Sequence, residues 1–185
     1  MSRKKLKLTA FFIAILVSAP FSLASAEEAT DSSEKIDQVL DLMASGKNEQ
    51  ALSELDAILR AEPRATKLRI LRGEILLALQ RAGEVPPELA KIPKNEQGPE
   101  YWSLSLLTYE QLLKSSSAEL KAQRLASLHQ SVSKLLSFRP QFIPLKPTFE
   151  RVLRDYPSAS LQREYCRLHR KQSKAPCAFD AVTKK

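Results

Sequence analysis

Few residues of this chain have the types and spacing that chemistry requires, and the two cysteines come first. Cys166 and Cys177 are separated by ten residues, unlike the two-residue spacing of a redox-active pair. In an exported chain they would meet an oxidising compartment and form one structural disulfide, worth roughly 2–3 kcal/mol. Because the sequence shows no third ligand beside them, we expect neither a metal site nor a cofactor.

The two histidines, His129 and His169, are weak candidates for acid–base catalysis. His129 falls in a predicted amphipathic helix beside Leu128, and His169 lies among basic residues without acidic support for a metal site or a triad. No glycine-rich phosphate loop and no nucleophile elbow occurs in the sequence. The chain is therefore not expected to be an enzyme.

The net charge of +8 is unevenly distributed along the chain. Residues 27–62 carry ten acidic and three basic residues, whereas residues 139–185 carry eleven basic and four acidic residues. Such asymmetry can orient a partner or attract an acidic surface. Alternatively, the two charged stretches are simply solvated surfaces.

Basic residues recur along one face of the last predicted helix. A basic docking face would comprise Arg163, Arg167, Arg170, Lys171 and Lys174, and Arg151 and Arg154 on the preceding predicted helix could join it. This face could bind an acidic partner, an anionic polymer or lipid headgroups. Alternatively, it is the solvated side of an amphipathic helix that packs through Leu161, Tyr165 and Leu168. Since no aromatic residues interleave with the basic ones for base stacking, we do not expect nucleic-acid binding.

Helix-forming residues dominate the segments that must position these side chains. Ala, Leu, Glu, Lys, Arg and Gln are abundant, and the chain has four glycines. Apolar residues recur at helical spacing, and no segment alternates apolar and polar residues as a half-buried strand does. We therefore predict an all-α fold. The predicted helices span residues 34–44, 48–61, 65–81, 100–113, 118–137, 148–156 and 158–171.

Glycine and proline indicate where these helices end. Gly46 is placed to end the first helix, Pro63 ends the second, and Gly83 closes the third. Residues 84–99 are rich in proline, with room for one short helix near 88–91. We interpret them as a loop between two halves of one domain.

The first residues have the order of charged, apolar and small residues that is typical of a secretory signal. The apolar run over 8–17 is too short to span a bilayer comfortably. We expect a signal peptide over 1–26, cleaved after Ala26, and a periplasmic or secreted protein without a transmembrane segment. An uncleaved anchor is the less favoured alternative. The remaining predicted parts are a flexible terminus over 27–33, a helical domain over 34–172 and a tail over 173–185, tied back by the disulfide.

The spacing around the second helix contains a repeat pattern. Intervals of 5, 4, 3 and 5 separate Gly46, Ala51, Leu55, Ile58 and Pro63. Glycine permits a tight turn between antiparallel helices, a small residue lets helices approach closely, and proline cannot continue a helix. The pattern resembles the second half of a tetratricopeptide repeat. Gly73, ten residues after Pro63, stands where this family has a small residue on the next first helix.

The resemblance weakens farther along the chain. Trp102 and Tyr109 look like the large residues of a first helix. However, Ile58 stands where the family has a small residue, and the segment after Gly83 lacks a normal second helix. An irregular helical bundle is the alternative. The intervals 4, 3 and 5 return at Leu128, Val132, Leu135 and Pro140.

The resemblance implies a short, irregular solenoid of stacked antiparallel helical hairpins. First helices of such repeats line an inner groove that binds peptides or partner domains. The possible groove residues are Gln38, Arg69, Arg72, Gln80, Trp102 and Tyr109. For the two aromatic residues, core positions are the alternative.

Two functions remain open from the sequence. The leading hypothesis is a scaffold or adaptor of the cell envelope that binds a partner protein through the groove. The alternative is an envelope protein that binds an anionic polymer or a membrane surface through its basic last helix. Loss of binding at high salt would favour the alternative, because salt screens exposed charges.

Overall fold

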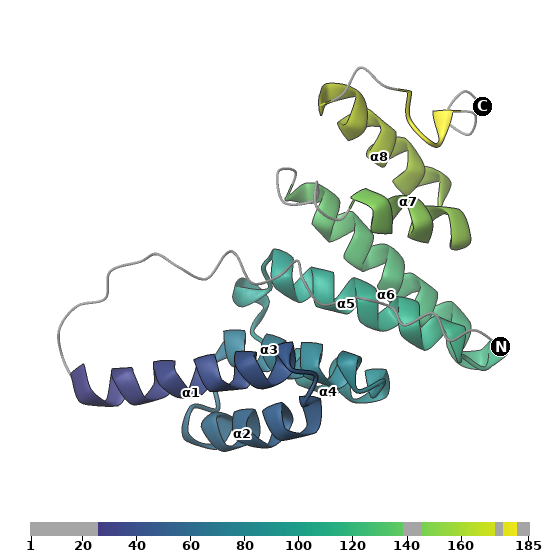
Figure 1. Ribbon diagram of the computed structural model, residues 1–185. Coiled ribbons are helices and arrows are strands. Elements are labelled where there is room, and N and C mark those ends of the chain that lie inside the picture. Colours follow the sequence, from purple (N-terminus) through teal and green to yellow (C-terminus); the bar gives the residue numbers. More distant parts are fainter. Residues whose placement is uncertain (1–25, 139–145, 173–175, 181–185) are drawn as a thin grey trace. The chain divides into compact units, whose positions relative to one another are not determined.

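The computed structural model describes residues 26–138, 146–172 and 176–180 (Figure 1). These residues are mostly helical and include no β-strand, so the prediction of an all-α fold is confirmed. In the same residues, no helix combines the length and apolarity needed to cross a membrane. Nearly all of the predicted signal peptide, and Lys174 of the basic docking face, lie outside the described residues.

The helices follow the predicted order with adjusted ends. The α-helices are α1 (Ala26–Ala44), α2 (Asn48–Ala61), α3 (Thr66–Ala78), α4 (Val85–Leu89), α5 (Pro99–Lys114), α6 (Ala118–Ser137), α7 (Lys146–Asp155) and α8 (Ala159–Gln172), with short 3-10 turns η2 (Ala82–Glu84) and η3 (Lys94–Glu96). The proline-rich residues 84–99 thus contain α4, because a proline in the first turn of a helix needs no backbone donor.

The chain divides after Ala61 into two compact units, which are described separately. The first contains the hairpin of α1 and α2. Its inward positions are apolar: Val39, Ala51 and Leu55 are fully buried. Ala51 and Leu55 are two of the residues that defined the repeat pattern.

A glycine turn joins α1 to α2. Gly46 has a φ of 74°, its amide donates to the carbonyl of Met43, and the amide of Lys47 donates to that of Leu42. These two bonds form a Schellman motif, which satisfies carbonyls left unpaired at a helix end. The prediction that Gly46 ends the helix is therefore confirmed.

The start of α1 differs from the prediction. The helix begins at Ala26, whereas we expected a separate terminal segment over 27–33. Alanine favours helix, and the sequence has Ala26 and Ala29 in this stretch. This local preference extends the helix by about two turns beyond its predicted start at residue 34.

The end of α3 corrects a second prediction. The helix ends at Ala78, and Gln80 takes the left-handed position with a φ of 63°. The amide of Gln80 donates to the carbonyl of Leu77, and the amide of Arg81 to that of Leu76. The same Schellman geometry therefore closes α3 at Gln80, and Gly83 instead belongs to the turn η2.

The second unit packs α5 against α6 and α6 against α8. Its core includes the fully buried Phe149 and Tyr165. Within it, the hydroxyls of Ser105 and Ser131 are 2.8 Å apart. A buried hydroxyl pair satisfies both polar groups and fixes how α5 and α6 meet.

A disulfide fastens the tail to α8. Cys166 and Cys177 are bonded, as predicted, with Cα atoms 5.5 Å apart. Phe179 then packs edge-on against Tyr165, with ring centroids 5.8 Å apart. The tail therefore holds α8 through one covalent and one apolar contact.

Candidate partner-binding site

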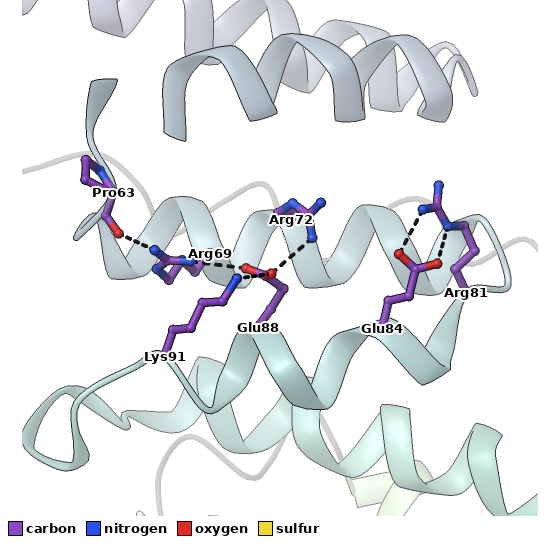
Figure 2. Close-up of polar contacts among 7 residues, drawn as sticks. All are labelled: Pro63, Arg69, Arg72, Arg81, Glu84, Glu88 and Lys91. Carbon is purple, nitrogen blue, oxygen red and sulfur yellow. Dashed lines mark hydrogen bonds and ion pairs between the residues drawn. The ribbon is translucent and has the colours of Figure 1, made fainter. Parts of the chain in front are cut away.

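Three basic side chains surround the carboxylate of Glu88, a buried residue of α4 (Figure 2). Nη1 of Arg69 lies 3.1 Å from Oε2 of Glu88. On the other oxygen, Oε1, Nη1 of Arg72 lies at 3.3 Å and Nζ of Lys91 at 2.6 Å. We call these four residues the Glu88 cluster.

Helix geometry brings the Glu88 cluster together. Arg69 and Arg72 are three residues apart on α3, so their side chains lie on one face of that helix, and α3 packs against α4. Lys91 follows Glu88 by three residues. Arg69 also donates to the carbonyl of Pro63, where the chain enters α3 (Figure 2).

The Glu88 cluster has more positive than negative charge. Three cations meet one carboxylate, and Arg72 also acts electrostatically on Glu84. The side chains of Arg69 and Arg72 are only 15% and 19% exposed, whereas that of Lys91 is 51% exposed. Solvent and any partner therefore meet the positive charge of the cluster mainly at Lys91.

A separate ion pair lies beyond the end of α3. Nε of Arg81 is 2.7 Å from Oε1 of Glu84 (Figure 2). The hydrogen bond from Arg81 holds the pKa of Glu84 below its ordinary value. This pair ties η2 to the end of α3.

A different face of α3 carries Glu74. This residue follows Arg72 by two positions, so it lies about 160° around the helix axis from it. Burial, with repulsion from Glu100, raises the pKa of Glu74 to about 7. Nearer the helix end, Nε2 of Gln111 donates to Oε1 of Gln80. The sequence analysis missed Glu74, although an acidic residue within the apolar run of α3 was a usable signal.

Two left-handed backbone positions have the spacing of a repeat. The two left-handed residues, Gly46 and Gln80, end consecutive hairpin turns and are 34 residues apart, the length of a tetratricopeptide repeat. A Cβ added to Gly73 would lie 2.5 Å from Cδ2 of Leu104 and 3.3 Å from Cγ1 of Val85. A small residue is therefore required where α3 meets both α4 and α5.

Residues 42–106 match the tetratricopeptide repeat family. This segment is tetratricopeptide-like. The match contains both left-handed turns and the buried Gly73, so the expected resemblance is confirmed over these residues. No curated protein and no solved structure matches the chain.

The groove residues that the tetratricopeptide resemblance suggested lie in different settings. Trp102 is buried, and its Nε1 donates to the carbonyl of Gln97. Tyr109 is half-buried and packs against the core. Gln38 on α1 and Gln80 after α3 are exposed. The structure thus favours the core alternative for Trp102.

Carboxylates pair with part of the predicted basic docking face. Arg151 binds Glu110, Arg167 binds Glu164, and Arg170 binds Asp180. These pairs offset the positive charge that a polyanion would meet. Of the other members, Arg154, Arg163 and Lys171 are exposed.

The histidines make structural contacts. Nε2 of His129 lies 3.0 Å from the carbonyl of Tyr156, which links α6 to the end of α7. Nε2 of His169 lies 3.0 Å from Nζ of Lys146, which links α8 to α7. Neither contact supplies the carboxylate that orients a catalytic histidine.

Proposed function

We propose that this protein is an adaptor that binds a partner protein through its tetratricopeptide-like segment. The observation that carries the proposal is the group of three basic side chains around Glu88, inside the matched residues. Proteins of this repeat class are built to present helix faces to peptides and domains. The proposed action is binding, without catalysis.

The cluster indicates the chemistry of the partner segment. The carboxylate of Glu88 holds Arg69 and Arg72 in place, so little side-chain freedom remains to be lost on binding. Lys91 projects into solvent beside them. An acidic side chain of a partner would add a fourth ion pair to the Glu88 cluster, at the exposed Lys91. We therefore propose an acidic partner segment.

Affinity capture from an extract of the source cells tests the proposal. The tagged chain from residue 27 onward would be the bait, at low and at high salt. We expect one defined protein, identified by mass spectrometry, whose capture weakens at high salt because the proposed contacts are ionic. Capture of an anionic polymer or lipid without a defined protein would contradict the adaptor proposal and support binding through the basic docking face.

Matched charge reversals then test the site. Lys91→Glu should weaken capture of that protein about tenfold or more, because reversal replaces one attraction with repulsion. Lys121→Glu, an exposed position on α6, is the control and should bind like wild type. Equal binding by both variants would remove the Glu88 cluster from the interface.

We also propose that the adaptor works in the cell envelope after export. The order of charged, apolar and small residues over 1–26 supports this location. Fractionation of cells that express a C-terminally tagged chain would test it. A tagged product found only in the cytoplasm, with residues 1–26 retained, would contradict the proposal.

A further inference from the structure

The structure brings a third metal-type ligand to the two cysteines. The sulfur atoms of Cys166 and Cys177 and a carboxylate oxygen of Asp180 all lie within 4.8 Å of one another. Both cysteines are buried, and Asp180 is half-buried. The sequence analysis expected no metal site because it found no third ligand. Asp180 joins the cysteines only through the fold of the tail.

Backbone and side-chain contacts fix the carboxylate of Asp180 beside the sulfurs. Its Oδ2 accepts a hydrogen bond from the amide of Cys177 at 2.9 Å. Its Oδ1 accepts one from Nη2 of Arg170. In addition, the amide of Asp180 donates to the carbonyl of Cys177. The turn that carries Asp180 is therefore ordered independently of any cation.

We propose that reduction of the Cys166–Cys177 disulfide converts this cluster into a binding site for a thiophilic divalent cation such as Zn²⁺. Two thiolates and the carboxylate of Asp180 would supply three ligands, with water in the fourth position. Sulfur with carboxylate oxygen is a ligand set that zinc accepts in tetrahedral geometry. The disulfide and the metal site are then alternative states of the same three residues.

Conversion of the disulfide into the metal site needs a dithiol reductant. The two thiols of the reductant become a disulfide as the Cys166–Cys177 bond breaks. The two electrons and two protons that the reductant loses yield two protein thiols. Metal binding then releases those two protons, because only thiolates bind the cation. No other oxidant or reductant takes part.

Local charge and packing fit this site. Two thiolates and a carboxylate around a divalent cation leave one negative charge, which the guanidinium of Arg170 on Asp180 balances. Phe179 also packs against Tyr165, a contact that does not involve the sulfur atoms. His169 lies three residues from Cys166 on the same face of α8. Its Nδ1 is buried without a hydrogen-bond partner among the described atoms, although it is not one of the three ligand atoms that lie within 4.8 Å of one another.

Cobalt(II), a spectroscopic substitute for zinc, tests the proposal on the purified chain. The chain reduced with a dithiol, then freed of it, should bind about one Co²⁺ with the absorption of a tetrahedral cobalt–thiolate site. Zn²⁺ should displace it. The oxidised chain should show no such absorption. Asp180→Asn should weaken cobalt binding about tenfold or more, whereas the matched control Asp155→Asn on α7 should bind like wild type.

Two results would overturn the proposal. One is cobalt binding by the reduced chain no tighter than by a Cys166→Ser, Cys177→Ser double variant. The other is equal affinity for wild type and Asp180→Asn. Circular dichroism accompanies each titration: if reduction removes the helical signal and cobalt does not restore it, the proposal also fails.

Discussion

At the scale of single residues, two helix ends share one backbone geometry at different energetic cost. Gly46 and Gln80 both adopt the left-handed region. Glycine has no Cβ and enters this region without strain, whereas a residue with a Cβ pays roughly 1–2 kcal/mol. The turn after α3 is therefore strained, and the turn after α1 is relaxed.

A residue with a Cβ at position 46 should strain the first turn, and glycine at position 80 should relieve the strain in the second. Gly46→Ala should lower the free energy of unfolding by about 1 kcal/mol, purely through backbone strain, because nothing lies within 4 Å of the added Cβ. Gln80→Gly should raise it by roughly 0.5 kcal/mol, because relief of the backbone strain exceeds the loss of the exposed hydrogen bond from Gln111. Urea denaturation measures both. An unchanged stability of Gly46→Ala would contradict the left-handed assignment.

Glu74 makes stability depend on pH. Its pKa is about 7 in the folded chain, against an ordinary value of 4.5. Since the folded state binds the proton more tightly, this group's contribution is fully present below pH 4.5 and is lost as the pH rises through 7. Glu74→Gln should remove the loss and be about 2 kcal/mol more stable than wild type at pH 8.

Denaturation of Glu74→Gln and wild type at pH 5 and pH 8 checks this prediction. The advantage of the variant should be larger at pH 8. Glu119→Gln, an exposed position in the first turn of α6, is the control and should show no such gain. An advantage of equal size at both pH values would instead indicate a packing effect.

At the scale of elements, α3 uses different faces to contact its neighbours in the second unit. One face contacts α4 and α5 at Gly73, and a neighbouring one carries the arginines of the Glu88 cluster. The apolar residues Ile75 and Leu76 are fully buried. Because successive side chains project in different directions around a helix axis, one short helix makes all of these contacts.

A larger side chain at position 73 should clash with Leu104 and push α3 away from α5. Gly73→Val should destabilise the chain by about 2–4 kcal/mol, because Leu104 is buried and its side chain cannot move away without displacing others. Gly83→Ala is the matched control, since nothing lies within 4 Å of its added Cβ. Thermal unfolding followed by circular dichroism compares the two variants. A tolerated Gly73→Val would contradict the close approach.

At the scale of the whole molecule, the chain forms two units, and the second contains the disulfide. The bond closes a short loop between α8 and the tail. A cross-link stabilises mainly by restricting the unfolded chain. The tail residues therefore contribute to the stability of the second unit.

Removing the cross-link should lower that stability. Cys177→Ser should reduce the free energy of unfolding by about 2–3 kcal/mol, and reduced wild type should behave alike in metal-free buffer. Urea unfolding followed by circular dichroism provides the measurement. A variant as stable as the oxidised wild type would show that the disulfide is dispensable for the fold.

The sequence by itself determined the features that depend on near neighbours. Helical spacing predicted the helices, Gly46 the first turn, and two cysteines one disulfide. Each follows from local backbone preference, apolar periodicity or the only available pairing. The resemblance to tetratricopeptide repeats used the same short intervals.

Only the tertiary structure decided the contacts between distant residues. Arg69 meets Glu88 across 19 residues, and Gln111 meets Gln80 across 31. The strained turn at Gln80, the burial of Trp102 and the approach of Asp180 to both cysteines likewise depend on how elements pack. Residue types set which pairs are chemically suited, but packing selects the pairs that form, because each element presents several faces and only one meets a given neighbour.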